Sequence, residues 1–448
     1  MSAAWPARPL ARLALVSLVA VATGAVSACS VTGSPRSGGV RATGATTTAA
    51  PSSAPRSPAA PTPTLFITPA DGNAAARPDA GITVSVTGGR IHHVTVQTSG
   101  DPVIGDLSQD GRTWQSRWTL GVDEHYTVVA TAAGPSGQVV STSSSFTTLA
   151  PRRVLRTQIF EGYQKTYGVG MPIMLAFNHP VTDRAAVERA LTLRTSRPVV
   201  GAWSWIDDEH LNFRPRDYWP AHTRVSFTGH LDGVRAGPGL YGAAKLTQTF
   251  NIGASLIVVA SARTHRMHVY RDGRLAHNWP ISTGTPGHDT PDGTYLTIEK
   301  ANPEEMKPSD IRPGQPGYYD LNVPWSVRFT FSGDFLHDAY WSVAQQGSVN
   351  VSHGCVNMHP ADAEAYYKMA RPGDPVTITG SPVAGTPGDG WTDWFLSWSQ
   401  LLAHSALHKA VSAGPTGSAL VDPAAVPPST VTAPIGTAAP HNARAFRS

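Results

Sequence analysis

Short runs of alternating apolar and polar residues dominate the chain between residues 63 and 252. In GITVSVTGG, Ile82, Val84 and Val86 alternate with polar or small residues, and HYTVVATAAG repeats the pattern. Glycine, proline, aspartate and asparagine separate the runs, as they separate the strands of all-β sandwiches. The pattern therefore predicts a mainly β fold.

The same pattern of short alternating segments and turns occurs twice, which indicates two similar domains. Each half carries a pair of tryptophans, and each half ends in a similar segment, SSSFTTLAP or LTQTFNIGAS. A weak repeat of about 90–100 residues predicts two immunoglobulin-like β-sandwich domains, at 63–150 and 151–252. The paired tryptophans are most simply core residues, with stacking on a ligand as the alternative: Trp114, Trp118, Trp203 and Trp205.

A third β-rich domain is predicted over residues 253–380. ASLIVVASARTHRMHVYRDGRLAHNWPIST reads as two strands joined at Asp272-Gly273, which is a hairpin signal. DGTYLTIEK, VRFTFSG and DPVTITG add further strands. One helix is expected in this domain, starting at Pro360 and ending before Pro372.

The segment 381–411 contains apolar residues near helical spacing, in GWTDWFLSWSQLLAHSALHKA. This spacing predicts a short helical segment that docks on the third domain. An interfacial membrane helix is the weaker alternative, because the segment lacks a strongly basic face.

Both ends of the chain differ from this β-rich part. Residues 1–28 show the order of an export signal: two arginines, an apolar run and small residues. Residues 29–62 and 412–448 are rich in Ser, Thr, Pro, Gly and Ala and lack the apolar surface that offsets the entropy of ordering. They predict a disordered tether and a disordered tail.

Cysteine is used at two positions, Cys29 and Cys355. Cys29 follows the small residues VSA and resembles the lipidation site of a bacterial lipoprotein. That resemblance implies a membrane partner, through a lipid anchor at the outer face of the cytoplasmic membrane, in the cell-wall space. An ordinary signal peptide is the alternative. With Cys29 lipidated, Cys355 cannot form an internal disulfide, so it is either an inert buried thiol or a reactive one.

Net charge excludes one class of partner. The chain has 35 Lys and Arg against 31 Asp and Glu. An excess this small and this scattered does not predict nucleic-acid binding.

The residues around Cys355 suggest nucleophilic chemistry. A thiol needs a base to become a nucleophile, and a histidine can take its proton. His353 and His337 are both candidates, and sequence spacing does not decide between them. Gly354 permits a sharp turn whose amides, at Gly354 and Cys355, would bind an oxyanion. A zinc site made by the two histidines and Cys355 is a rival interpretation.

A longer motif joins these residues. HDAYWSVAQQGSVNVSHGCVN contains His, fourteen residues, then Ser-His-Gly-Cys-x-Asn. This motif is similar to that of the L,D-transpeptidases of bacterial cell walls. The resemblance extends over 255–379 and includes TPDGTY at 290–295. Two immunoglobulin-like domains before it resemble the actinobacterial, mycobacterial-type enzymes. The family uses no metal or other cofactor.

The resemblance implies a role for each motif residue. Cys355 would be the nucleophile and His337 the general base, oriented by the backbone carbonyl of Asp338. A carboxylate side chain at Asp338 would raise the basicity of His337 or pair with a cationic substrate group. His353 and Gly354 would shape the site, and the amides there would bind the oxyanion. Ser352 would match the motif hydroxyl, and Asn357 would fix the loop or a substrate group.

A proline-rich stretch at 304–325 lies between predicted strands, and long ordered loops of this kind are often lids. The resemblance places a substrate-covering flap here. A loop packed on itself is the alternative. Candidate pocket walls are Met306, Tyr318, Tyr319 and Trp341.

The implied activity is peptidoglycan cross-linking. The enzyme would attack a tetrapeptide donor stem, release D-alanine, and pass the acyl group to a side-chain amine of an acceptor stem, giving a 3→3 cross-link. Transfer of the acyl group to water, as in an L,D-carboxypeptidase, or to a protein lysine, as in an anchoring enzyme, is the alternative. A wall-binding scaffold without enzymatic activity is a further alternative. The resemblance also implies acylation by carbapenem-type β-lactams.

Overall fold

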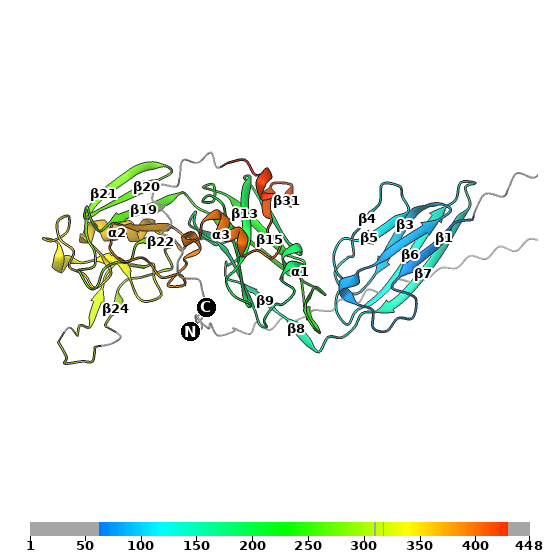
Figure 1. Cartoon of the computed structure of the whole chain (residues 1–448), viewed down its shortest axis with the longest axis horizontal. Coiled ribbons are helices and arrows are strands. Elements are labelled where there is room, and N and C mark those ends of the chain that lie inside the picture. The colour runs from blue at the N-terminus through cyan, green and yellow to red at the C-terminus, as the bar shows by residue number, and fades with distance from the viewer. Residues whose placement is uncertain (1–61, 309–310, 317, 429–448) are drawn as a thin grey trace, which may run out of the picture. The chain divides into compact units, whose positions relative to one another are not determined.

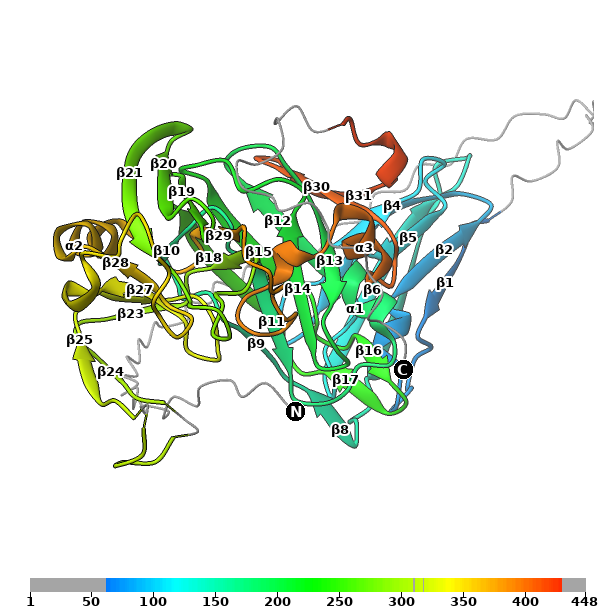
Figure 2. The ribbon, with the colours of Figure 1, turned by 60° about the vertical axis from the view of Figure 1, so that its left-hand side comes forward.

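The computed structural model describes residues 62–308, 311–316 and 318–428. The predicted signal peptide, Cys29 and all but the last residue of the predicted tether lie outside the described residues. Strands dominate the described part of the chain, which confirms the predicted mainly β fold (Figure 1, Figure 2). No helix in this part is long and apolar enough to span a membrane.

The first β domain consists of two antiparallel sheets around one core, as its alternating pattern predicts. The sheet orders are β1-β2-β5-β4 and β3-β6-β7. Along β6, Tyr126, Val128 and Ala130 are buried while the residues between them are less so. The elements are β1 (Thr64–Thr68), η1 (Pro78–Ala80), β2 (Thr83–Thr87), β3 (Arg90–Gln97), β4 (Gly105–Leu107), β5 (Thr113–Ser116), β6 (His125–Ala133) and β7 (Val139–Thr147).

The second β domain has a tryptophan-rich core. Trp203 and Trp205 are 2% and 3% exposed, which confirms them as core residues. Trp118 is different, because its ring stacks on His230 of this domain with centroids 3.7 Å apart. The elements are β8 (Arg153–Leu155), β9 (Thr157–Ile159), β10 (Thr166–Tyr167), β11 (Ile173–Phe177), α1 (Arg184–Arg189), β12 (Leu191–Thr195), β13 (Val199–Trp205), β14 (His210–Pro215), β15 (Arg224–Gly229), β16 (Arg235–Gly237), β17 (Leu240–Gly242) and β18 (Leu246–Ile252).

The sheet of the second domain is completed from the far end of the sequence. A hairpin of β30 (Ala410–Gly414) and β31 (Gly417–Val421) pairs with β13, giving the order β31-β30-β13-β14-β11-β9. The short η4 (Pro423–Ala425) follows. The prediction of a disordered tail from residue 412 is therefore wrong for 412–428. Small residues mask the alternation there, and pairing with β13 supplies the backbone hydrogen bonds that composition does not reveal.

The third domain is built on a nine-stranded sheet of order β22-β29-β19-β20-β21-β28-β27-β26-β23. The predicted hairpin at Asp272-Gly273 joins β20 to β21, and both residues have positive φ, 48° and 78°. The prediction of two strands in this stretch is wrong: it holds three, because the chain also turns at His265, where φ is 55°, between β19 and β20. The strands are β19 (Leu256–Ser261), β20 (Arg266–Arg271), β21 (Arg274–Ser282), β22 (Gly293–Leu296), β23 (Glu299–Ala301), β26 (Ser326–Arg328), β27 (Phe335–Asp338), β28 (Val356–Met358) and β29 (Pro375–Thr379).

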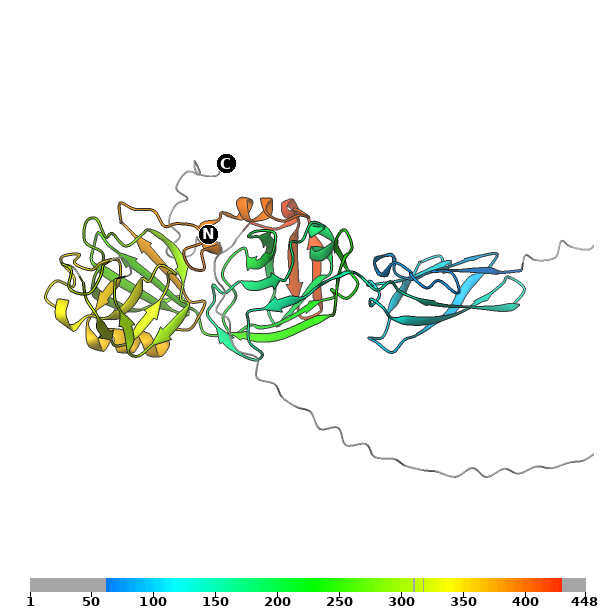
Figure 3. The same ribbon diagram turned by 90° about the horizontal axis from the view of Figure 1, so that it is seen from below.

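The predicted helix is α2 (Pro360–Met369), capped by the His359 side chain, which accepts from the Ala361 amide at 3.3 Å. The segment after β29 does not dock on the third domain alone. Its η3 (Asp393–Phe395) contacts β22, whereas α3 (Trp398–Ala403) contacts β13 of the second domain (Figure 3). The docking prediction is thus corrected: the segment ties the second and third domains together.

Candidate active site around Cys355

Parallel pairing of β27 with β28 brings the two halves of the motif together. His337 pairs with Asn357, and Leu336 pairs with Val356, so Cys355 lies just before the start of β28. The Cys355 Sγ lies 3.9 Å from the Gly333 carbonyl oxygen, just before β27. Two segments that are eighteen positions apart in sequence therefore form one site.

The SHGC loop is held in shape by its own serine. Ser352 Oγ donates to the Cys355 carbonyl at 2.6 Å and accepts from the Gly354 amide at 3.2 Å. Gly354 has φ +131°, and a Cβ there would lie 2.3 Å from Asp334 Oδ1, so the position requires glycine. The Gly354 amide is already engaged. An oxyanion that reaches this amide must compete with Ser352 Oγ.

His337 is positioned as a base. It is 3% exposed, and its Nδ1–H donates to the Asp338 carbonyl oxygen at 2.7 Å. A carbonyl only accepts hydrogen bonds, so Nδ1 carries the proton and Nε2 keeps the lone pair. Burial lowers the pKa of His337 to about 4, and the bond to Asp338 opposes that shift. The imidazole is therefore neutral at pH 7.

Cys355 is a half-buried free thiol. Burial raises the pKa of Cys355 to about 12; the Asp334 carboxylate raises it too, and the Phe335 amide opposes the shift. Together with the neutral imidazole, this favours a resting thiol rather than a thiolate–imidazolium pair. The proton must consequently leave the sulfur during attack, in step with bond formation.

The Asp338 side chain plays a smaller part than its backbone. Its carboxyl group is buried, which raises the pKa of Asp338. Asp338 Oδ1 has no hydrogen-bond partner among the described residues. The pKa of His337 responds to burial and to the Asp338 backbone, not to this carboxylate. The expected gain in basicity from the carboxylate is thus not found.

Asn357 fixes a neighbouring turn. Its Nδ2 donates to Ser342 Oγ at 3.0 Å, and both side chains are buried. Ser342 ends η2 (Tyr340–Ser342), which also carries Trp341. The Trp341 ring lies 5.8 Å from the His337 ring and is 46% exposed. Asn357 therefore ties β28 to the turn that forms one wall of the site.

The predicted flap is a two-stranded hairpin of β24 (Glu304–Met306) and β25 (Leu321–Val323), in which Met306 pairs with Leu321. Tyr319 lies with its ring 5.6 Å from the exposed His353 ring. Tyr318 instead bonds within the hairpin, from its hydroxyl to Asp320 at 3.4 Å. Tyr319 therefore contacts the SHGC loop.

Two supporting residues were not singled out from the sequence. Thr290 Oγ1 donates to the Gly354 carbonyl at 2.6 Å and accepts from the Gly284 amide at 2.9 Å, which buttresses the loop. Asp334 lies against Gly354, and burial raises its pKa to about 6, with the Asp389 charge adding to the shift. Thr290 lies in the stretch TPDGTY, which forms part of the resemblance noted from the sequence, but no sequence signal marked Asp334.

Replacing Asp334 with Asn should lower the thiol pKa of Cys355. The substitution keeps the shape but removes a negative charge that disfavours the thiolate. The thiolate fraction at pH 9 should rise roughly 3- to 10-fold, measured by ultraviolet absorbance and by the rate of alkylation. Exposed Asp320→Asn provides the matched control. An unchanged titration in Asp334→Asn would show that the Asp334 charge does not act on the sulfur.

Comparison with known proteins gives two family matches. A bacterial Ig domain model matches residues 73–235, and an L,D-transpeptidase catalytic domain model matches residues 255–378.

Similar whole proteins come from Mycobacterium tuberculosis. L,D-transpeptidase 5 (strain ATCC 25618 / H37Rv) is 36% identical over 361 residues, 78% of either chain. L,D-transpeptidase 2 (strain CDC 1551 / Oshkosh) is 32% identical over 348 residues, 77% of this chain and 85% of the relative. A crystal structure of L,D-transpeptidase 3 from Mycobacterium tuberculosis, in complex with a faropenem-derived adduct, is 29% identical; the match covers 51% of this chain and 98% of that chain, with a TM-score of 0.43.

Proposed function

The chain belongs to the L,D-transpeptidase family, and from that premise we propose that it cross-links peptidoglycan stems with Cys355 as nucleophile and His337 as general base. The observation that carries the proposal is the buried, neutral His337, fixed on the Asp338 carbonyl at 2.7 Å. Parallel pairing of β27 and β28 sets this base beside the strand that Cys355 precedes. A base held in one tautomer next to a thiol is what nucleophilic cysteine catalysis needs.

In the acylation step, His337 Nε2 takes the thiol proton as the Cys355 sulfur attacks the carbonyl before the terminal D-alanine of a tetrapeptide donor. The carbonyl oxygen becomes an oxyanion near the amides of Gly354 and Cys355. Collapse of this intermediate breaks the C–N bond. The imidazolium then returns its proton to the leaving D-alanine amine, and a thioester remains on the sulfur.

In the transfer step, a side-chain amine of an acceptor stem attacks the thioester. His337 Nε2 takes a proton from that amine, the C–S bond breaks, and the sulfur leaves and regains a proton. The product is a 3→3 cross-link. The flap hairpin, with Tyr319 over His353, would limit the access of water during this step.

Product analysis tests the choice of acceptor. The full chain is incubated with a tetrapeptide stem alone and with an added acceptor stem, and the products are separated by mass. Transpeptidation predicts a dimer whose mass is that of both stems less one alanine. A tripeptide without any dimer would contradict cross-linking and favour an L,D-carboxypeptidase. If a lysine-bearing protein were added and only a stem–protein conjugate formed, an anchoring enzyme would be favoured.

We extend the proposal to β-lactams of carbapenem type. The strained lactam carbonyl is attacked by the Cys355 sulfur, the C–N bond opens, and the ring nitrogen takes the thiol proton by way of His337. No atoms leave in this step, so the intact protein should gain the whole mass of the drug, as intact-mass spectrometry would measure. A protein mass that stayed unchanged after prolonged incubation would count against this site chemistry.

We also propose that the protein is exported and anchored to the membrane by a lipid. The order of residues 1–29 supports export and lipid anchoring at Cys29, with the folded domains facing the wall. Mass analysis of the mature N-terminus from membranes would detect the lipid on Cys29. An unmodified N-terminus in the soluble fraction would contradict the anchor.

A further inference from the structure

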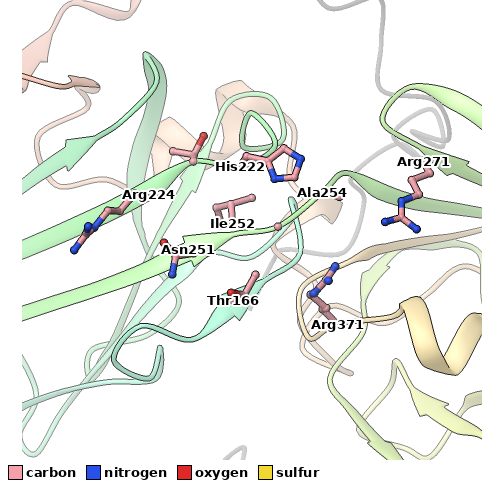
Figure 4. A pocket seen from close by; sticks show the side chains of 10 residues that line it. Thr166, His222, Arg224, Asn251, Ile252, Ala254, Arg271 and Arg371 are labelled. Atoms are coloured by element: carbon pink, nitrogen blue, oxygen red, sulfur yellow. The ribbon is translucent and has the colours of Figure 1, made fainter.

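A cavity of about 460 Å³ lies away from Cys355, where the second and third domains meet. It is bounded by β10, the end of β18 with the link to β19, the end of β20 and the residues after α2 (Figure 4). Its volume falls within the range of small-molecule sites, but it is an open hollow, since His222, Arg224 and Arg271 are exposed. None of the motif residues around Cys355 lines it.

The lining of this cavity is rich in cations. Arg224, Arg271 and Arg371 line it together with His222, and no Asp or Glu of the described residues does so. In the described part of the chain, none of these three arginines forms a salt bridge. In Figure 4 the Arg224 side chain points away from Arg271 and Arg371, so these two arginines supply the positive potential that attracts anions.

Arg271 and Arg371 are the centre of this charge. Figure 4 shows their side chains reaching from opposite sides into the same gap. Both also line an adjoining cavity of about 150 Å³, together with Lys368, which is paired with Glu364 at 2.7 Å and adds no free charge. The Arg371 guanidinium lies close to the Gly253 backbone, since a Cβ built on Gly253 would lie 3.3 Å from its Nη1. The two arginines therefore stand where the two hollows join.

Two carboxyl groups lie close to this site, and neither forms a salt bridge with the arginines among the described residues. Asp272, next to Arg271 in the sequence, is exposed, and its Oδ1 accepts from the Ser255 amide at 3.0 Å. Asp374 is fully buried, and its Oδ2 accepts from the Arg371 amide at 2.7 Å. Burial raises the pKa of Asp374 to about 8, and Arg371 and Lys300 oppose that shift. The group is thus largely protonated at pH 7, and the guanidinium charges remain available to a ligand.

We propose that this cavity binds a phosphate group of an anionic wall polymer, held between Arg271 and Arg371. The planar guanidinium fork pairs with phosphate oxygens in two-point contacts that a lysine does not make. Thr166 also lines the cavity and offers a hydroxyl to the sugar that carries the phosphate. Asn251 lines it too, with its Nδ2 donating to the Gln164 carbonyl at 3.4 Å, which leaves its Oδ1 for the sugar. The wall setting rests on the proposed function, whereas the phosphate site rests on the cavity alone.

Calorimetric titration of the full chain tests the site without any catalysis. The probes are glucose 1-phosphate, inorganic phosphate, gluconate as a carboxylate, and a glycerol phosphate oligomer. We expect glucose 1-phosphate to bind more tightly than gluconate and inorganic phosphate, and the oligomer to bind at least as tightly. Inorganic phosphate binding as well as glucose 1-phosphate would overturn the polymer assignment, and preferred binding of gluconate would overturn the phosphate one.

Variants locate the binding. The double change Arg271→Gln with Arg371→Gln should weaken glucose 1-phosphate binding by about 10-fold or more, and Arg271→Gln alone should show part of the loss if the double variant does not fold. Exposed Arg274→Gln, three residues from Arg271, should bind as the unaltered chain does. Equal affinity in the double variant, or no binding in the unaltered chain, would overturn the proposal. If the chain proved to have no cross-linking activity, the binding of glucose 1-phosphate would be unaffected, so failure of the proposed function and failure of the phosphate site can be told apart.

Discussion

Replacing Cys355 with Ala is expected to reduce turnover of a tetrapeptide stem by about 10⁴-fold or more. The reason is that no other described residue can form the thioester, since Cys355 is the free thiol of that part of the chain. Stability should change little, within about 1 kcal/mol, because the sulfur makes only a weak contact with the Gly333 oxygen at 3.9 Å. Release of D-alanine and thermal unfolding measure the two effects.

Cys355→Ser is the matched control for this loss. A hydroxyl preserves the size of the group but is far less nucleophilic than a thiol, so the serine variant should also be nearly inactive while remaining folded. If Cys355→Ala kept more than a tenth of the activity, another residue would have to be the nucleophile. The zinc interpretation of the motif is not supported, since no cluster of three metal-ligating side chains occurs among the described residues.

Replacing His337 with Asn is expected to reduce turnover by about 10²–10⁴-fold. An amide can still donate to the Asp338 carbonyl, but it cannot take the thiol proton, whose transfer the raised pKa of Cys355 makes difficult. His353→Asn is the control, because His353 is exposed and contacts Tyr319 rather than a backbone carbonyl. Activity retained in His337→Asn but lost in His353→Asn would move the base to His353.

The pH dependence follows from the same histidine. Its folded pKa of about 4 lies below the ordinary value of 6.5, so the acid limb of activity should fall near pH 4 rather than near 6.5. Between these values the unfolded chain binds a proton at His337 that the folded chain does not, so stability falls as pH falls. His337→Asn should remove this part of the loss, as denaturant unfolding at pH 7 and pH 4.5 would measure.

The sequence predicted the pairing of His337 with Cys355 only through a resemblance, because spacing alone left His353 as a second candidate base. The structure separates the two histidines by burial: His337 is 3% exposed and bound to a carbonyl, while His353 is exposed. The helix α2 was predictable because Pro360 and Pro372-Gly373 bracket it and act locally.

Features that depend on distant pairing could not be predicted. Asp334 lies twenty positions before Gly354, and its contact exists because β27 and β28 pair in parallel. The hairpin at 410–421 pairs with β13, about two hundred residues earlier, and its small residues resemble a disordered tail in composition alone. The engagement of the Gly354 amide by Ser352 Oγ likewise appears only in the folded loop.

Rapid-quench mass spectrometry of the full chain, mixed with a tetrapeptide stem and no acceptor, would detect the acyl-enzyme on Cys355 itself. We predict a transient mass gain equal to the stem less one alanine, mapped to the peptide that contains Cys355 and absent from Cys355→Ala. Release of D-alanine with no adduct, or an adduct on any other residue, would contradict the assignment of Cys355 as the nucleophile.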